Sequence, residues 1–131
     1  MKLKFRAWHK ELKKMFDVKS FVFAICNATI ASRDDIVPSR TCSYDDIILM
    51  QSTGLFDKNG KEIFGNDIVE WKHNGTGRLI RGIVKRDVDF DYWGVQVCRF
   101  DDLTPFGHLA NQKVTVLGNI YENKELLEEL K

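Results

Sequence analysis

Hydrophobic and polar residues alternate most cleanly at the beginning of the chain, over residues 2–8. Basic side chains fall on one side of this segment and apolar side chains on the other: Lys2, Lys4 and Arg6 against Leu3, Phe5 and Ala7. A period of two residues is typical of a half-buried strand, here with a basic outer face. Residues 9–12 are predicted to form a turn, and residues 13–18 are predicted to form a second strand. The chain is therefore expected to open with a β-hairpin.

The part that follows is less regular. Residues 21–31 are apolar but interrupted, and they fit either a buried strand or a short helix, with a strand favoured over residues 21–25. Residues 32–46 are polar and contain Pro38, so they are predicted to form a loop. Strand character returns over residues 47–51.

The second half of the chain predicts a series of short strands. The tight-turn signal Asn59-Gly60 comes first, because both residue types tolerate positive φ. The strands after it are expected at residues 67–73, 78–87, 92–100 and 113–117. The first three are connected as hairpins, and this order favours a small barrel. Asn123 then caps a short helix whose leucines share one face.

Composition adds that the chain can fold without a metal or a disulfide. Its 131 residues are enough to bury about two-thirds of the unfolded surface. Twenty basic and nineteen acidic side chains give a net charge of +1, so bulk charge predicts no avid binding of polyanions. Three cysteines lack Cys-x-x-Cys spacing and are expected to be reduced thiols. No apolar run approaches the roughly 20 residues of a membrane span, and a cytoplasmic location is expected.

Four segments carry a family resemblance through their order along the chain. They are Leu3–Trp8, Leu49–Leu55, Leu55–Val69 and Leu117–Asn123. Together they resemble the YopX family of phage and prophage proteins. The resemblance implies an SH3-like barrel and a phage origin, and it supplies no active-site residue. Where the family has Glu-Gly before Asp67, this chain has Gly65-Asn66, and the bend is expected to survive because asparagine tolerates left-handed geometry.

The expected fold class is mostly β: a small SH3-like barrel with an N-terminal β-hairpin extension and a short C-terminal helix. Residues 1–52 are expected to form the hairpin and a variable loop region packed on the barrel. Residues 53–131 are expected to form the barrel and the helix, and the two parts together one structural unit. Because the helix has only about two turns, it must pack against the barrel or another subunit.

Candidate patterns for catalysis and metal binding are weak. Asp87, Asp89 and Asp91 alternate as at the start of a calcium loop, but the sixth position is Tyr92 and the twelfth is Cys98. These carboxylates are therefore interpreted as solvated groups beside a hairpin turn. The three histidines lack helical ligand spacing, and no serine lies in a recognisable nucleophile turn. No enzymatic activity, metal site or cofactor is predicted.

Basic side chains keep nucleic-acid binding open as an alternative function, because small barrels often bind nucleic acids through a basic and aromatic face. The candidate contacts with nucleic acid or a protein partner are Lys2, Lys4, Arg6, Lys10, Arg81 and Lys85. On residues 78–87, however, basic side chains fall on both faces. A charged N-terminal strand is also an ordinary protection of a sheet edge. The nearby aromatic residues Trp71, Tyr92 and Trp93 are interpreted mainly as core.

Protein interaction is the favoured hypothesis. Open edges of a partial barrel can pair with other chains, and the leucine face of the terminal helix can bind a partner or a second copy. The candidate oligomer contacts are Leu126, Leu127 and Leu130. The sequence thus predicts a phage-derived, non-catalytic protein of the bacterial cytoplasm that acts through protein contacts, with a homo-oligomer expected.

Overall fold

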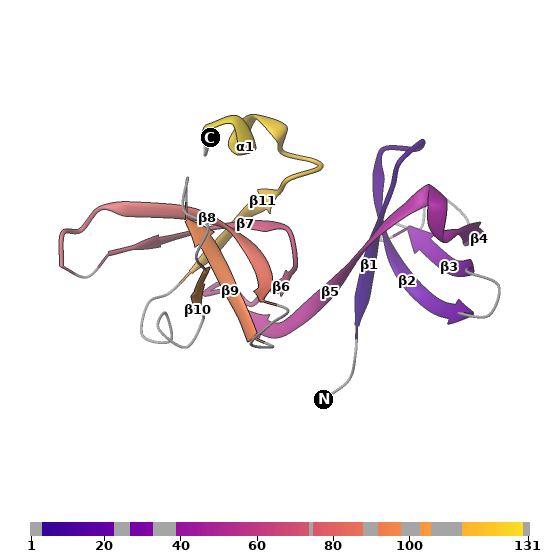
Figure 1. Ribbon diagram of the computed structural model, residues 1–131, viewed down its shortest axis with the longest axis horizontal. Helices are drawn as coiled ribbons and strands as arrows, with labels where there is room; N and C mark the ends of the chain where they lie inside the picture. Colours follow the sequence, from indigo (N-terminus) through magenta and orange to yellow (C-terminus); the bar gives the residue numbers. More distant parts are fainter. Residues whose placement is uncertain are drawn as a thin grey trace. The chain divides into compact units, whose positions relative to one another are not determined.

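The computed structural model describes residues 4–22, 27–32, 39–73, 75–87, 92–97, 103–105 and 114–129 (Figure 1). Contacts within the chain divide it into two compact units, Met1–Ser52 and Thr53–Lys131. The division falls inside one long strand, β5 (Ile47–Phe56), so both units contain part of this strand.

The first unit is an antiparallel sheet that begins with the predicted hairpin. Its elements are β1 (Phe5–His9), β2 (Lys14–Val22), β3 (Asn27–Ser32), β4 (Arg40–Ser43), the 3-10 helix η2 (Tyr44–Asp46) and the start of β5. The order across the sheet is β4-β3-β2-β1-β5, followed by β6 (Glu62–Phe64). The pairing of β1 with β2 confirms the opening hairpin. The buried core consists of Ala7, Phe16, Ala28, Ile30 and Ile47.

Arg6 is buried, which contradicts the predicted basic outer face of the first strand. Only 3% of this residue is exposed, whereas Lys4 is exposed. β1 lies between β2 and β5 and not at the edge of the sheet, with Asp17 and Met50 opposite Arg6. The interpretation of Arg6 as edge protection is therefore wrong, because a sequence that alternates does not reveal how many strands flank it.

Part of the predicted loop at residues 32–46 is regular structure. Residues 33–38 lie outside the described part of the chain, but β4 pairs with β3, and η2 follows it. The Ser43 hydroxyl accepts a hydrogen bond from the Asp45 N–H at 3.3 Å, which stabilises the start of η2. β4 is a short polar strand at the edge of its sheet, so it lacks the hydrophobic alternation that identifies a strand.

The second unit contains the antiparallel strand series that was expected. After β6 come β7 (Asp67–Lys72), β8 (Leu79–Asp87), β9 (Tyr92–Val97), β10 (Leu103–Pro105), β11 (Thr115–Asn119) and the helix α1 (Lys124–Glu129). The order is β10-β9-β8-β7-β11, so over the described residues this sheet does not close into a complete barrel. The mostly β class, with a barrel-like sheet and a short terminal helix, is confirmed, and β10 is an additional strand.

The second unit has its own hydrophobic core. Its buried members are Ile63, Val69, Trp71, Val84, Val95 and Val114. Trp93 is partly buried against them. The interpretation of Trp71 and Trp93 as core residues is thus confirmed, while the side chain of Tyr92 lies outside the description. Full burial of one large apolar side chain stabilises a fold by about 1.5–3 kcal/mol, so this core is a major source of stability for the unit.

Asp57 organises the turn that precedes β6. Gly60 has a φ of +83°, and its N–H donates to the backbone oxygen of Asp57 at 3.0 Å. The Asp57 carboxylate accepts the N–H groups of Asn59 and Lys61 through Oδ1, both at 2.8 Å. Its Oδ2 accepts the N–H of Val116 at 3.0 Å. One buried side chain therefore joins the turn to β11.

Asn66 forms the bend before β7. Its φ of +68° lies in the left-handed region, which confirms the prediction that asparagine preserves this bend. Its backbone N–H donates to the oxygen of Val84 at 2.9 Å, and its oxygen accepts from the N–H of Ile120 at 3.2 Å. Its Nδ2 donates to the Tyr121 hydroxyl at 3.3 Å. The bend is thus connected both to β8 and to the residues after β11.

Residues 118–123 form a hydrogen-bonded connection between β11 and α1. Asn119 Oδ1 accepts the N–H groups of Tyr121 and Glu122 at 3.0 and 2.9 Å. Asn123 Oδ1 accepts the N–H of Asn119 at 3.1 Å, and a Cβ at Gly118 would overlap with the Asn123 side chain. The helix begins directly after Asn123, where it was predicted.

Within the described residues, neither helix is long and apolar enough to cross a membrane.

Candidate functional site

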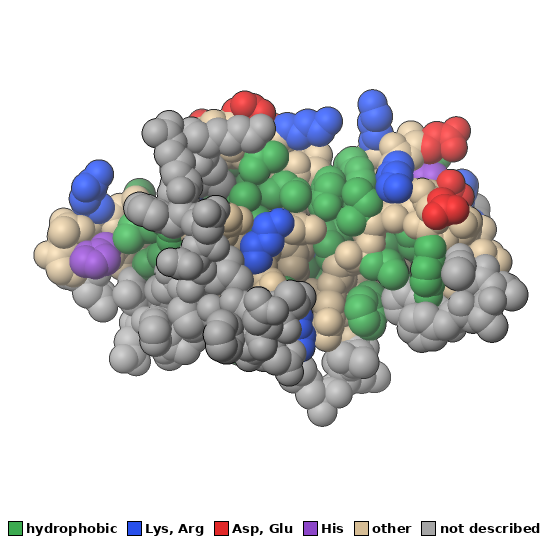
Figure 2. Space-filling view, in the orientation of Figure 1, with side chains coloured by type: hydrophobic (Ala, Val, Ile, Leu, Met, Phe, Trp, Pro, Cys, Tyr) green, Lys and Arg blue, Asp and Glu red, His purple; other side chains and the backbone are tan. Residues whose placement is uncertain are grey.

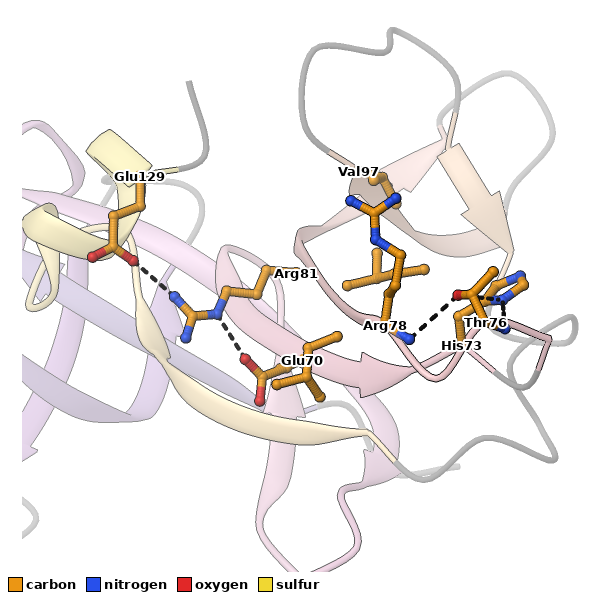
Figure 3. Close-up of a pocket in the computed structure, with 9 residues that line it drawn as sticks. Glu70, His73, Thr76, Arg78, Arg81, Val97 and Glu129 are labelled. Carbon is orange, nitrogen blue, oxygen red and sulfur yellow. Dashed lines mark hydrogen bonds and ion pairs between the residues drawn. The ribbon is translucent and has the colours of Figure 1, made fainter.

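An open groove lies at the end of the β7–β8 hairpin in the second unit. Its volume is about 650 Å³. It is lined by residues of β7, β8, β9, α1 and the hairpin turn, namely Glu70, His73, Thr76, Arg78, Leu79, Ile80, Arg81, Val97 and Glu129 (Figure 3). All nine belong to the unit Thr53–Lys131, so a single compact part of the chain forms this groove.

Two ion pairs hold the Arg81 side chain at one end of the groove. Its Nε donates to Glu70 Oε2 and its Nη1 to Glu129 Oε2, both at 2.7 Å (Figure 3). Glu70 lies directly opposite Arg81 in the pairing of β7 with β8, so this contact follows from the strand register. The hydrogen bond to Glu70 raises the pKa of Arg81, and the charges of both glutamates add to the effect. The guanidinium is charged, but two carboxylates compensate it.

The hairpin turn at the other end is tied together by His73. Its Nδ1 accepts the N–H groups of Gly75 and Thr76, both at 3.2 Å. Its backbone N–H donates to the oxygen of Arg78 at 2.8 Å, and its own oxygen accepts from the N–H of Gly77 at 2.8 Å. Because Nδ1 is an acceptor here, the neutral ring carries its hydrogen on Nε2. The imidazole is therefore held in one tautomer by the turn.

Between these two ends the groove has apolar walls. Leu79 is 66% exposed, the largest exposure among the large hydrophobic residues that the structure describes, and Ile80 and Val97 are partly buried against the core. Arg78 is exposed, and its side chain points toward Val97 and away from the ion pairs of Arg81 (Figure 3). The groove thus combines an apolar surface with one exposed cation at its rim.

The two glutamates at Arg81 should differ in their contribution to stability. The Glu70 side chain is 18% exposed and that of Glu129 is 60% exposed, so water screens the second ion pair more strongly. We expect Glu70→Gln to lower the free energy of unfolding by about 1 kcal/mol and Glu129→Gln by less than about 0.5 kcal/mol. Urea unfolding measures both changes, and equal losses would contradict this ranking.

The basic residues predicted in the first unit do not form a stripe in the described part of the structure. Lys4 and Lys10 are exposed, but Arg6 between them is buried. Lys10 Nζ donates to the backbone oxygen of Asp45 at 2.9 Å. Lys2 lies outside the described residues. The N-terminal segment therefore provides separate exposed lysines where a continuous basic face was expected.

The other predicted contact residues lie in the second unit. Arg81 lines the groove, whereas Lys85 does not. Lys85 is partly buried, its Nζ donates to Asn66 Oδ1 at 3.0 Å, and burial lowers its pKa. The predicted oligomer contacts Leu126 and Leu127 are partly exposed on α1, and Leu130 lies outside the described residues.

The remaining predicted candidates for catalysis or metal binding do not form a site within the described residues. His9 is 6% exposed, and its Nδ1 accepts the N–H of Leu12 at 3.1 Å. Of the acidic pattern Asp87–Asp91, only the backbone of Asp87 at the end of β8 is described. Cys42 is a free thiol. No three His, Cys, Asp or Glu side chains of the described residues are grouped so that they could hold a metal ion.

Most groove residues were not singled out from the sequence. One sequence signal does point to them: residues 71–86 contain five basic residues and no acidic one. This run includes the hairpin turn and most of β8, and its members that line the groove are Arg78 and Arg81. The two compensating carboxylates lie outside the run, so the sequence does not show which of its cations is compensated.

Comparison with known proteins shows the family to which this chain belongs. The family model of the YopX protein matches residues 4–128. The chain belongs to the YopX family. The crystal structure of protein EF1440 from Enterococcus faecalis is similar to this YopX chain, with a TM-score of 0.62 and 25% sequence identity. The similarity covers 97% of this chain and 99% of that chain. No curated protein matches.

The family match includes most of the groove. Eight of its nine lining residues fall within residues 4–128 of this YopX chain, and Glu129 follows directly after that range. The strands that carry the groove are therefore part of the region that the family model describes, while the outer carboxylate of Arg81 lies just beyond it.

Proposed function

We propose that this YopX-family protein is a phage- or prophage-derived protein of the bacterial cytoplasm that acts by binding protein, including copies of itself, without catalysis. The resemblance of the chain to phage and prophage proteins supports the proposed origin. Protein binding is supported by the surface of the second unit, which exposes large apolar side chains, while two of its predicted basic contacts, Arg81 and Lys85, have hydrogen-bond partners within the chain.

The observation that carries this proposal is the exposure of large apolar side chains in the second unit. Leu79 is 66% exposed, Phe56 61% and Leu55 44%. Leu55 and Phe56 are adjacent at the end of β5, and Leu79 begins β8. Apolar and aromatic side chains are typical of the centre of protein interfaces, where burial contributes about 25 cal/mol per Å² of apolar surface. These side chains supply anchors for a protein partner.

Nucleic-acid binding is the alternative, and the surroundings of three predicted basic contacts make it the weaker one. Arg81 is held in two ion pairs, Lys85 is partly buried and Arg6 is 3% exposed. A phosphate group would have to compete with Glu70 and Glu129 for the Arg81 guanidinium. Affinity for nucleic acid depends on basic side chains that are free to neutralise phosphates.

Photo-crosslinking from the exposed apolar positions tests the proposal. The photoreactive amino acid p-benzoylphenylalanine replaces Leu79 or Phe56 in the full chain, which is expressed in bacterial cells and irradiated. We expect adducts with protein, because these positions lie at the proposed contact surface. The matched control carries the same amino acid in place of Lys124, an exposed residue at the start of α1. Mass spectrometry then identifies the attached molecule.

The identity of the adducts decides between the functions. Protein adducts that are several times more abundant from Leu79 or Phe56 than from Lys124 would support protein binding, and adducts between two copies would show self-association. Adducts that nuclease removes would favour nucleic-acid binding. The absence of adducts from both apolar positions would contradict the proposed surface.

A further inference from the structure

We infer that the groove at the end of the β7–β8 hairpin binds a short segment of a partner protein in which an acidic side chain lies next to an apolar one. This inference rests on the proposed protein-binding function and assigns a site and a ligand class to it. Two features carry it: the apolar wall formed by Leu79, Ile80 and Val97, and the exposed Arg78 at its rim.

The charge at the rim is the first step of the argument. Arg81 has two carboxylate partners, so it is already compensated within the chain. Arg78 lines the same groove and is exposed, and its side chain points away from those carboxylates (Figure 3). Lys72 is also exposed, and it lies opposite Leu79 in the strand register. The hairpin end is therefore locally basic, which favours a ligand that brings a carboxylate.

The apolar wall is the second step. Leu79 is 66% exposed and lines the same groove as Arg78. Figure 2 shows hydrophobic side chains beside basic and histidine side chains over this end of the β7–β8 hairpin. A ligand that covers Leu79 removes apolar surface from water while its carboxylate reaches the guanidinium of Arg78. An acidic side chain next to an apolar one in a peptide satisfies both requirements.

The hairpin turn makes this surface largely preformed. Hydrogen bonds from Gly75 and Thr76 to His73 Nδ1 hold the ring against the turn. The Thr76 hydroxyl accepts the N–H of Arg78 at 3.3 Å, and the His73 N–H donates to the oxygen of Arg78 at 2.8 Å. The backbone that carries the cation is thus fixed before a ligand binds, which lowers the entropic cost of binding.

The same groove is less suited to a nucleic acid. The carboxylates of Glu70 and Glu129 line it, and they repel a chain of phosphates. A single carboxylate that binds at Arg78 avoids them, because the Arg78 side chain extends away from the ion pairs of Arg81 (Figure 3). The carboxylates of Glu70 and Glu129 therefore favour a ligand that carries one carboxylate over a ligand that carries a chain of phosphates.

A titration with two matched peptide pools tests the inference on the full chain. The first pool consists of short peptides in which Asp or Glu lies next to Leu, Ile, Val or Phe. The second pool is identical except that Asn and Gln replace the acids. Backbone amide signals of the ¹⁵N-labelled protein are followed by NMR. We expect the signals of residues 72–81 to shift with the acidic pool, at concentrations about three- to fivefold lower than with the amide pool.

Two variants connect the shifts to the groove. Arg78→Gln should remove the difference between the pools, and Leu79→Ser should weaken binding of both pools. The matched control is Arg40→Gln, which removes an exposed arginine from β4 in the first unit and should leave the titration unchanged. Both groove residues are exposed, so their replacement is compatible with folding, and the unbound spectra verify this directly.

The remaining outcomes would overturn the inference. Equal binding of the two pools, or shifts confined to other residues, would show that Arg78 does not select an acid at this groove. Shifts of residues 72–81 caused by an oligonucleotide, and not by peptides, would assign the groove to nucleic acid. Protein adducts from Leu79 combined with no preference for the acidic pool would overturn this ligand class and leave the proposed function standing.

Discussion

Replacement of Gly82 by valine should destabilise the second unit by about 3 kcal/mol or more, which can be enough to unfold it. Gly82 lies within β8, and a Cβ built there overlaps with Val95 Cγ1 and comes within 2.8 Å of the backbone oxygen of Gln96. Val95 is a buried core residue of β9, the strand paired with this part of β8. Space for a side chain therefore requires the two strands to separate.

Gly82→Ala should also lower the free energy of unfolding, by about 1–3 kcal/mol.

Urea unfolding followed by circular dichroism measures this effect. The matched control is Thr115→Val, which places a valine in the same sheet at a half-buried position of β11 without a change in side-chain size. We expect the control to stay within about 0.5 kcal/mol of the unsubstituted protein. If Gly82→Val were as stable as that protein, β8 and β9 could not approach each other as closely as they do in the structure.

Replacement of Asp57 by asparagine should cost about 3 kcal/mol although it preserves the shape of the side chain. The carboxylate accepts three backbone N–H groups, from Asn59, Lys61 and Val116, and the residue is 7% exposed. An amide oxygen can still accept the two bonds of the turn. The amide nitrogen, however, faces the N–H of Val116, so a partly buried donor there loses its acceptor. The connection between the turn and β11 should therefore weaken.

The same carboxylate predicts a dependence of stability on pH. Burial by itself raises the pKa of Asp57, but the hydrogen bonds from Val116, Lys61 and Asn59 and the charge of Lys61 outweigh it, so the pKa lies below its ordinary value. A depressed pKa in the folded state stabilises the fold above the unfolded value of about 3.9. This contribution is lost as the pH falls from there through the folded pKa.

Chemical unfolding at neutral pH and at about pH 3 separates this effect from general acid destabilisation. The difference in stability between the unsubstituted protein and Asp57→Asn should shrink at the lower pH, because protonation removes the charge that asparagine lacks. The matched control is Asp45→Asn, which changes an exposed acid of η2 and should have little effect at either pH. A difference that stays constant with pH would contradict the role given to the Asp57 charge.

Features that depend on neighbouring residues were predictable from the sequence. The opening hairpin requires only alternation on both sides of a turn, and β1 pairs with β2 as expected. The bend before β7 requires a residue that tolerates positive φ, and Asn66 has a φ of +68°. The start of α1 after Asn123 follows from a local preference at helix ends. In each case the physical cause lies within a few residues of the feature.

Features that depend on residues far apart in the chain were not predictable in this way. Arg81 and Glu129 are 48 positions apart, and Asp57 and Val116 are 59 positions apart. Arg81 was predicted as a contact with nucleic acid or a protein partner, and the sequence did not indicate that strand pairing brings Glu70 opposite it. The edge strand β4 was missed because its residues are polar, and pairing with β3 supplies the order that its sequence does not indicate.

The sequence by itself therefore determined the mostly β class, the positions of the main turns and the membership in the YopX family. Only the tertiary structure decided which charged side chains reach the solvent: Arg6 is buried, Arg81 is compensated and Arg78 is exposed at the groove. The physical reason is that alternation specifies the two faces of a strand, whereas burial and ion pairing depend on the strand or helix that lies against each face. Those neighbours are set by contacts between distant parts of the chain.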